Sequence, residues 1–248
     1  MASSAVRLLE TLLQQKKFAG TLARPREEPR VVSSGLDDLD RTIGGGWPLG
    51  AISEIVGARS SGRTRVLLST LATATREGQV VALVDALDRF DPRSAAEAGL
   101  DLSRVLWVRG APLSVETARP AVIDHAIRQA VRAGDLIIRA GGFAVVALDL
   151  CDIPARRLQA LPSVTWLRLA HANEGRETVA LLGSEAPVGR SARGVSVQIE
   201  ARPCWRGASA QARRLSGFTP VITPRWAGLI PTLGAEAGTA AAGQRGRA

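Results

Sequence analysis

One short segment of the chain combines residue types and a spacing suited to binding phosphate. It reads Gly57-Ala-Arg-Ser-Ser-Gly62-Arg63-Thr64 and lies between an apolar run and a helical pattern. The two glycines permit backbone angles that aim successive N–H groups into one anion-binding concavity, and a helix N-terminus adds the positive end of its dipole. The spacing matches the phosphate-loop pattern GxxxxGK followed by Ser or Thr at every position except one. The predicted nucleotide-binding residues are Gly57, Ser60, Ser61, Gly62, Arg63 and Thr64, with the Thr64 hydroxyl as a ligand for Mg²⁺.

The exception is Arg63, which stands where the pattern has lysine. Lysine is a compact charge that folds back over the loop to the terminal phosphates, whereas a guanidinium group is larger and planar. We therefore expect no ATP hydrolysis and no obligatory cofactor, and ATP or ADP with Mg²⁺ is the ligand that the loop would take. The alternative is a turn that only joins a strand to a helix and binds no nucleotide.

A carboxylate that would complete a Mg²⁺ site follows about 90 residues later. Asp149 ends the apolar run FAVVALD, where folds with a phosphate loop place their second metal-binding acid. Apolar strands that end in aspartate are common, so Asp149 carries weight only together with the loop at 57–64.

Strand-like and helix-like patterns alternate between residues 31 and 201. Continuous apolar strands separated by helices indicate a largely parallel sheet that is covered on both faces. The predicted fold class is therefore α/β, with helices on both sides of the sheet. Strands are predicted at 51–57, 79–86, 104–110, 143–150, 178–184 and 195–201, and helices at 64–78, 91–99 and 114–134.

The two ends of the chain differ from this core in composition. Residues 1–30 combine an amphipathic helix over 4–17 with a charged linker, and residues 202–248 form a basic segment that is predicted to be disordered from about 234. Nine arginines and two glutamates lie between Pro187 and the end of the chain. This excess of positive charge would suit nucleic acid phosphates or an acidic protein, and a solvated tail is the alternative. The candidate contacts are Leu9, Leu13, Arg190, Arg193, Trp205, Arg206, Arg213, Arg214 and Trp226.

Composition is that of a cytosolic globular protein. Apolar residues make up 46% of the 248 residues and charged residues 22%, which is enough to form a packed core. No apolar run reaches the roughly 18 residues needed to span a bilayer. Cys151 and Cys204 have no partner at metal-ligand spacing, and we expect both to be small buried hydrophobes.

Two long stretches of the sequence resemble the RecA recombinase core. The first is SSGLDDLDRTIGGGWPLGAISEIVGARSSGRT at 33–64, and the second is REGQVVALVDALDRFDPRSAAEAGLDLSRVLWVRG at 76–110. The similarity weakens toward residue 201. This resemblance implies a RecA-type P-loop fold in the recombination and damage-response family.

Several positions depart from what the resemblance implies. Leu87 stands where RecA proteins carry the glutamate that activates the attacking water, and an apolar side chain cannot orient water. The neighbouring Asp88 is expected to point elsewhere, and Ser184 replaces a nucleotide-sensing glutamine. Both DNA-binding loops are reduced, at 149–166 and 185–194. Together these changes imply that the chain keeps the RecA scaffold and is not an enzyme.

The layout is similar to a short bacterial class of RecA-like proteins called ImuA. The stretches GDLIIRAGGFAVVALDL at 134–150 and GSEAPVGRSARGVSVQIEA at 183–201 carry this likeness. The likeness implies a cytoplasmic, nucleoid-associated accessory of SOS-induced translesion mutagenesis. Its expected partners are RecA, the inactive Y-family polymerase homologue ImuB and, through ImuB, an error-prone replicative polymerase, with DNA as a further candidate. The alternative is a slow P-loop ATPase that binds DNA through its basic C-terminal region.

Overall fold

The computed structural model describes residues 30–189, 193–207 and 214–226, with only the backbone described at 215–220, 225 and 226. The predicted helix over 4–17 and the segment from 227 onward lie outside the described residues. No helix in the described part of the chain has the length and apolar character that a membrane crossing requires.

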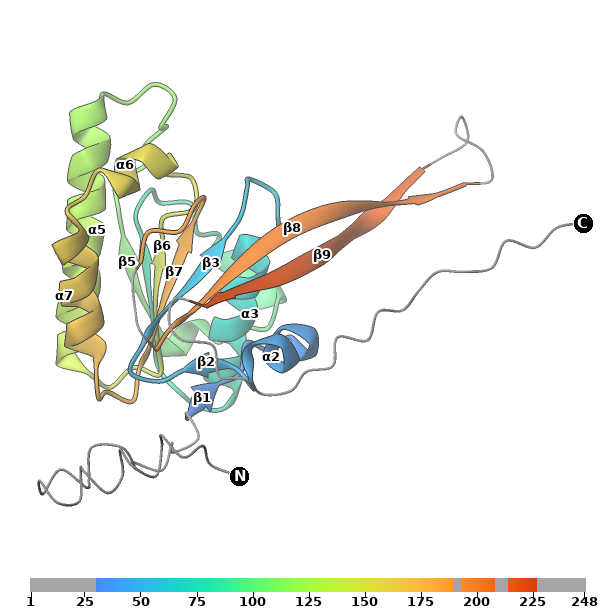
Figure 1. Ribbon diagram of the computed structural model, residues 1–248, viewed down its shortest axis with the longest axis horizontal. Coiled ribbons are helices and arrows are strands. Elements are labelled where there is room, and N and C mark those ends of the chain that lie inside the picture. The colour runs from blue at the N-terminus through green and yellow to red at the C-terminus, as the bar shows by residue number, and fades with distance from the viewer. Residues whose placement is uncertain (1–29, 190–192, 208–213, 227–248) are drawn as a thin grey trace, which may run out of the picture.

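A seven-stranded sheet with the order β5-β4-β6-β7-β3-β8-β9 forms the centre of the molecule (Figure 1). Its strands pair in parallel except at the edge, where β9 runs antiparallel to β8. A separate antiparallel pair is formed by β1 and β2. The strands are β1 (Val31–Val32), β2 (Trp47–Pro48), β3 (Ile52–Val56), β4 (Val81–Asp85), β5 (Val105–Arg109), β6 (Val145–Asp149), β7 (Val179–Ser184), β8 (Val195–Arg206) and β9 (Arg214–Trp226).

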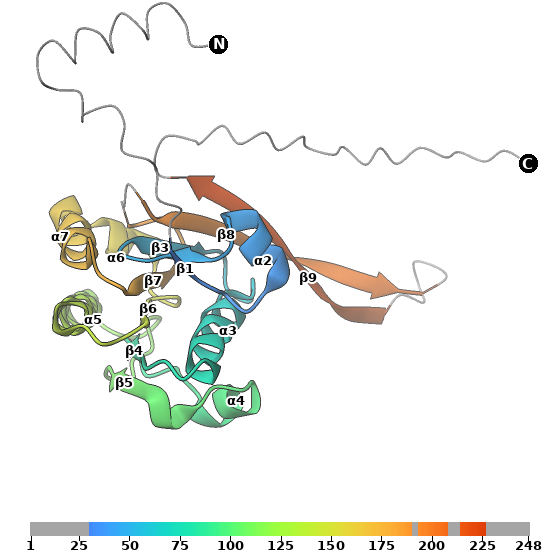
Figure 2. The same cartoon turned by 90° about the horizontal axis from the view of Figure 1, so that it is seen from below.

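Helices cover both faces of this sheet, as Figure 2 shows. The long helix α5 and helix α7 pack on one face, while α2, α3 and α4 pack on the other. Every residue of β3, β4 and β7 is buried, which explains why these strands are largely apolar without strict alternation. The predicted α/β fold class is confirmed. The helices are α2 (Asp37–Ile43), α3 (Arg63–Arg76), α4 (Pro92–Glu97), α5 (Pro120–Ala140), α6 (Ala155–Gln159) and α7 (Ser163–Asn173).

The helix predicted at 114–134 is displaced, since α5 begins at Pro120 and ends at Ala140. Pro120 is the first helical residue, where its missing N–H costs no hydrogen bond. The predicted stop at Gly134 was wrong because this glycine serves close packing: an added Cβ would lie 2.9 Å from Leu148 Cδ2. The helix ends instead at Gly141, whose φ is 73°.

The sheet also continues past residue 201, where the sequence predicted that the core ends. Strand β8 reaches Arg206 and pairs along its whole length with β9. Only residues 196–198 of β8 pair with β3, so the distal half of the β8–β9 hairpin extends away from the body as a two-stranded arm (Figures 1 and 2). Sequence reasoning missed β9 because Pro220 and Pro224 argue against a strand interior.

Candidate functional site

The predicted phosphate loop connects β3 to α3, as its spacing requires. Gly57 passes close to β8: an added Cβ would lie 2.4 Å from the Ile199 carbonyl oxygen. Gly62 takes the left-handed conformation at the N-terminus of α3, with φ of 102°. No side chain caps this helix among the described residues, so its first N–H groups remain available to an anion.

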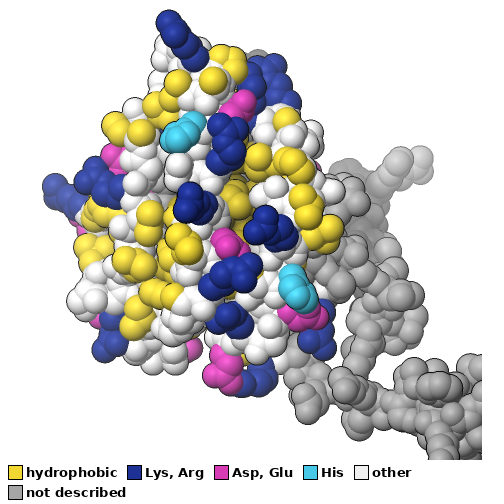
Figure 3. Space-filling model, turned by 90° about the vertical axis from the view of Figure 1, so that its left-hand side faces the viewer, with side chains coloured by type: hydrophobic (Ala, Val, Ile, Leu, Met, Phe, Trp, Pro, Cys, Tyr) yellow, Lys and Arg dark blue, Asp and Glu magenta, His cyan; other side chains and the backbone are white. Residues whose placement is uncertain are grey.

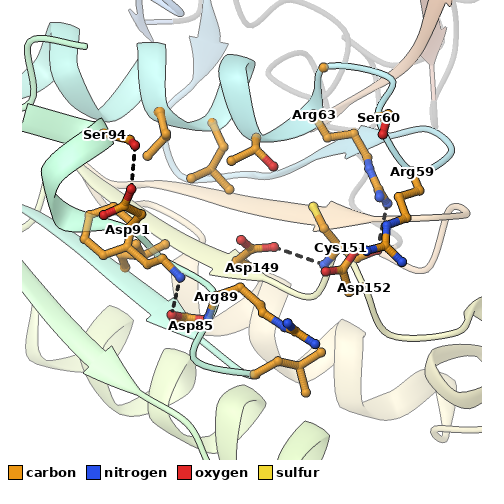
Figure 4. Close-up of a pocket in the computed structure, with 17 residues that line it drawn as sticks. Arg59, Ser60, Arg63, Asp85, Arg89, Asp91, Ser94, Asp149, Cys151 and Asp152 are labelled. Atoms are coloured by element: carbon orange, nitrogen blue, oxygen red, sulfur yellow. Dashed lines mark hydrogen bonds between the residues drawn. The ribbon is translucent and has the colours of Figure 1, made fainter. Parts of the chain in front are cut away.

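A cavity of about 480 Å³ lies between this loop, α3 and the carboxyl ends of β4 and β6. Ligands of open parallel sheets bind at this edge of the strands. Figure 4 shows arginine side chains from the loop at one end of the cavity, Asp149 near its middle and the start of α4 at the other end. The charged lining residues are Arg59, Arg63, Asp85, Arg89, Asp91, Asp149 and Asp152.

Arg63 is 5% exposed and points from the start of α3 across to the turn after β6 (Figure 4). Its Nη1 donates a hydrogen bond of 2.9 Å to the Cys151 carbonyl oxygen. No carboxylate in the described part of the chain forms an ion pair with this guanidinium group. The side chain is therefore held against the protein backbone.

Asp149 and Asp85 are register partners at the ends of the neighbouring strands β6 and β4. Asp85 accepts hydrogen bonds from the backbone N–H groups of Arg89, at 2.9 Å, and Phe90, at 2.8 Å. Asp149 accepts one from the Cys151 N–H at 3.0 Å. Burial, with a smaller contribution from the Asp85 charge, raises the pKa of Asp149 above its ordinary value. A cation would lower this electrostatic cost.

Leu87 stands where the resemblance to RecA implies a catalytic glutamate. Leu87 is 3% exposed and belongs to the apolar cluster beneath α5, with one side toward the cavity. Asp88 takes a φ of 57° and accepts two hydrogen bonds of 2.9 Å from Arg109. That guanidinium lies 4.5 Å from the Trp107 ring centroid, and its hydrogen bonds lower the pKa of Asp88. Asp88 therefore points away from the cavity, as expected.

The remaining predicted loop residues divide into two groups. Ser60 and Thr64 line the cavity with Gly62 and Arg63, and Thr64 is exposed. Ser61 is buried behind the loop and does not line the cavity. Ser184, at the end of β7, donates to the Ala186 carbonyl oxygen at 2.9 Å instead of facing the cavity.

Sequence reasoning missed several cavity residues. Asp85 ends the apolar run VVALVD, the same signal that identified Asp149, and would have been found by it. Arg59, Arg89, Asp91 and Asp152 lie on turns and helix starts, whose side-chain directions depend on the folded structure.

Both cysteines are only partly buried, which corrects the expectation that they are fully buried. Cys151 lies over Gly183 of β7, where an added Cβ would come within 2.8 Å of its Sγ. Burial raises the pKa of this thiol, so it is a poor nucleophile.

The candidate partner contacts do not gather at the cavity. Trp205, Arg206 and Arg214 lie on the distal part of the β8–β9 arm, and Arg193 is exposed at the start of that hairpin. Trp226 pairs through its backbone with Val195. Leu9, Leu13, Arg190 and Arg213 lie outside the described residues.

This arrangement of strand, phosphate loop and helix defines a P-loop α/β domain. The profile of the RecA N-terminal domain matches residues 10–150, which is more than half of the chain. The chain belongs to the RecA family.

Proteins named Protein RecA are among its relatives. The one from Nostoc punctiforme is 39% identical over 119 residues, which cover 48% of this chain and 31% of the relative. The one from Chlorobaculum parvum is 34% identical over 148 residues, which cover 57% and 38%. The matched segment thus spans about a third of the length of these relatives.

Proposed function

We propose that this chain is a non-catalytic RecA-like accessory in SOS-induced translesion mutagenesis, similar to the ImuA class. It would bind RecA and the inactive Y-family polymerase homologue ImuB, and through ImuB an error-prone replicative polymerase. The observation that carries the loss of catalysis is the environment of Leu87 and Asp88, described above.

Hydrolysis of ATP requires a group that orients or deprotonates the attacking water. Leu87 has no such group, and the two hydrogen bonds from Arg109 direct the Asp88 carboxylate away from the cavity. Rotating Asp88 into the cavity would break both bonds. Neither of the two residues therefore offers a carboxylate to the cavity at the position where the resemblance to RecA implies a catalytic glutamate.

The residues of the cavity fit a nucleotide only in part. The uncapped start of α3 suits a phosphate, and Thr64 and Asp149 would hold Mg²⁺. Arg63, in contrast, is bonded to the Cys151 carbonyl oxygen instead of projecting over the loop. The Mg²⁺ ion that accompanies a nucleotide would offset the negative charge of Asp85 and Asp149. Partner binding would not require hydrolysis of that nucleotide.

The face formed by α5 and α7 supports a role in partner binding. Figure 3 shows hydrophobic side chains interspersed with basic ones on this side of the molecule. Exposed apolar side chains occur on both helices, at Val122 and Leu136 of α5 and at Val164 and Leu167 of α7. Exposed apolar side chains on two packed helices are suited to contact with a protein partner.

Two measurements with the purified full chain test this proposal. With MgATP, we expect no phosphate release above that of the Thr64→Ala variant. Hydrolysis that Thr64→Ala abolishes would instead support an active ATPase.

In pull-down experiments, wild type should retain RecA or ImuB, while Leu136→Asp and Leu167→Asp should weaken retention at least tenfold. The matched control is Val80→Asp, which changes an exposed apolar residue that belongs to neither α5 nor α7. Equal retention by all variants would exclude this face as the docking surface.

DNA binding by the β8–β9 arm is a second candidate function. Strand pairing places Arg206 opposite Arg214, and the neighbouring Trp205 is 55% exposed. An aromatic ring beside clustered arginines suits stacking on bases together with phosphate contacts.

We expect single-stranded DNA affinity that falls as salt rises and that drops about tenfold in Trp205→Ala, the range of one lost base stack. Arg206→Ala with Arg214→Ala should reduce the salt dependence, whereas Arg93→Ala on α4 should not. Affinity that is unchanged in both arm variants would exclude the arm as the DNA site.

A further inference from the structure

We infer that Arg63 braces the phosphate loop: its guanidinium group ties the loop to the turn after β6, so that the loop keeps its shape without nucleotide. This inference goes beyond the proposed function, because it concerns the stability of the loop and holds whichever partner the protein binds.

The bond from Arg63 joins segments that are not neighbours in the sheet. The loop follows β3, the Cys151 turn follows β6, and β7 lies between these two strands. The hydrogen bond of 2.9 Å connects residues 88 positions apart in the sequence. The bond thus links the loop after β3 to the turn after β6, across the carboxyl end of β7.

The end of β7 is shaped to leave room for this crossing. Gly183 has no side chain, and Cys151 lies directly above it, so that even an added Cβ would come within 2.8 Å of the Cys151 sulfur. Because the turn can rest on β7, its carbonyl oxygen comes within reach of Arg63.

Because Arg63 is buried, its guanidinium group depends on the hydrogen bond to the Cys151 carbonyl oxygen. A guanidinium group that is 5% exposed loses most of its water, and a hydrogen bond to a backbone carbonyl compensates part of that loss. In contrast, the Arg59 side chain of the same loop is 81% exposed and reaches only a distant ion pair with Glu116, at 3.9 Å. Arg63 is buried and bonded to the backbone, whereas Arg59 is exposed and weakly paired, so Arg59 is a matched control.

Thermal unfolding of the full-length protein tests the inference. Arg63→Met keeps an unbranched stem as far as the position of Nε and removes the guanidinium donors. We expect it to lower Tm by about 4–8 °C, the effect of losing one charged hydrogen bond in a chain of this size. Arg59→Met should change Tm by less than about 1 °C, as expected for an exposed ion pair. Equal melting of the two variants would overturn the inference.

Ligand addition provides the second arm. Millimolar MgADP, or inorganic phosphate alone, should raise the Tm of wild type by less than Arg63→Met lowers it. A rise larger than that loss would show that the anion, and not Arg63, is the main support of the loop, and would overturn the inference.

Hydrogen exchange keeps the test decisive if Arg63→Met does not fold. The Ser61 amide, which donates to the Ala58 carbonyl oxygen at 3.1 Å within the loop, should already be protected in ligand-free wild type. Protection that appears only with MgADP would contradict a built-in brace.

Discussion

The two sides of the cavity differ in how far they depart from a working P-loop site. On the loop side, Gly57 and Gly62 preserve the path of the backbone, and the start of α3 is free of side-chain caps. On the β4 side, Leu87 is part of the apolar core and Asp88 is bonded to Arg109. An anion-binding concavity depends on backbone geometry, whereas water activation depends on one carboxylate. The comparison teaches that the backbone geometry of an anion-binding loop can persist although the position for a water-activating carboxylate holds another residue.

Restoring an acid on the β4 side should have the largest effect on stability. Leu87→Glu places a carboxylate at a position that is 3% exposed, which should cost about 3–4 kcal/mol without producing hydrolysis. Urea unfolding and phosphate release would measure the two effects. Leu87→Met is the control and should cost less than about 1.5 kcal/mol. A stable Leu87→Glu variant that hydrolyses ATP would show that both sides are still poised for catalysis.

Adding one methyl group on the loop side should have the next largest effect. Gly57→Ala would bring its Cβ to 2.4 Å from the Ile199 carbonyl oxygen, and we expect a loss of about 2–3 kcal/mol. Gly62→Ala meets no atom within 4 Å but must adopt a φ of 102°, which should cost about 1 kcal/mol. Urea midpoints compare the two. A larger loss at Gly62 would mean that backbone strain, and not the approach of β8, shapes the loop.

Asp149→Asn tests how much the charge of Asp149, which lies between the two sides of the cavity, affects stability. Because the pKa of Asp149 is raised in the folded state, folding binds a proton, and this contribution to stability is lost as pH rises above the ordinary aspartate value of 3.8 through the folded pKa. Asparagine can keep the hydrogen bond from the Cys151 N–H without the charge. The variant should be more stable than wild type at pH 7, by about 1 kcal/mol, and the gain should vanish near pH 3. A gain that does not depend on pH would rule out the charge as its source.

Removing the contact between Arg109 and Asp88 should have the smallest effect on stability. Arg109 is 59% exposed on its side chain, so the coupling in a double-mutant cycle of Asp88→Ala and Arg109→Ala should stay below about 1 kcal/mol. Urea unfolding of the two single variants and the double variant gives this value. A coupling of several kcal/mol would make this pair, and not the burial of Leu87, the main feature that fixes the β4 side.

Local patterns in the sequence were sufficient for the fold class and for part of the cavity. Largely apolar runs predicted the strands β3, β4, β6 and β7, since strands covered on both faces are mostly apolar. Glycine spacing located the loop, because its conformation needs residues without side chains. Asp85 carried the same signal as Asp149 and was overlooked.

The errors occurred where a residue's role depends on a distant neighbour. Taken alone, Gly134 predicts the end of a helix. In the structure it lies within α5, where its missing side chain leaves room for Leu148 of β6. Prolines in β9 argue against a strand, yet antiparallel pairing with β8 includes them in an edge strand.

The sequence by itself determined that this chain folds as a RecA-like α/β domain with a phosphate loop and without a glutamate at position 87. Hydrophobic period, glycine spacing and residue identity are properties of the chain that need no partner. Only the tertiary structure decided that Arg63 reaches Cys151, that Asp88 turns to Arg109 and that β8 extends into an arm. The first two depend on contacts between segments distant in the sequence, and the third on the pairing of two consecutive strands beyond the body of the sheet. Such contacts exist only once the chain has folded.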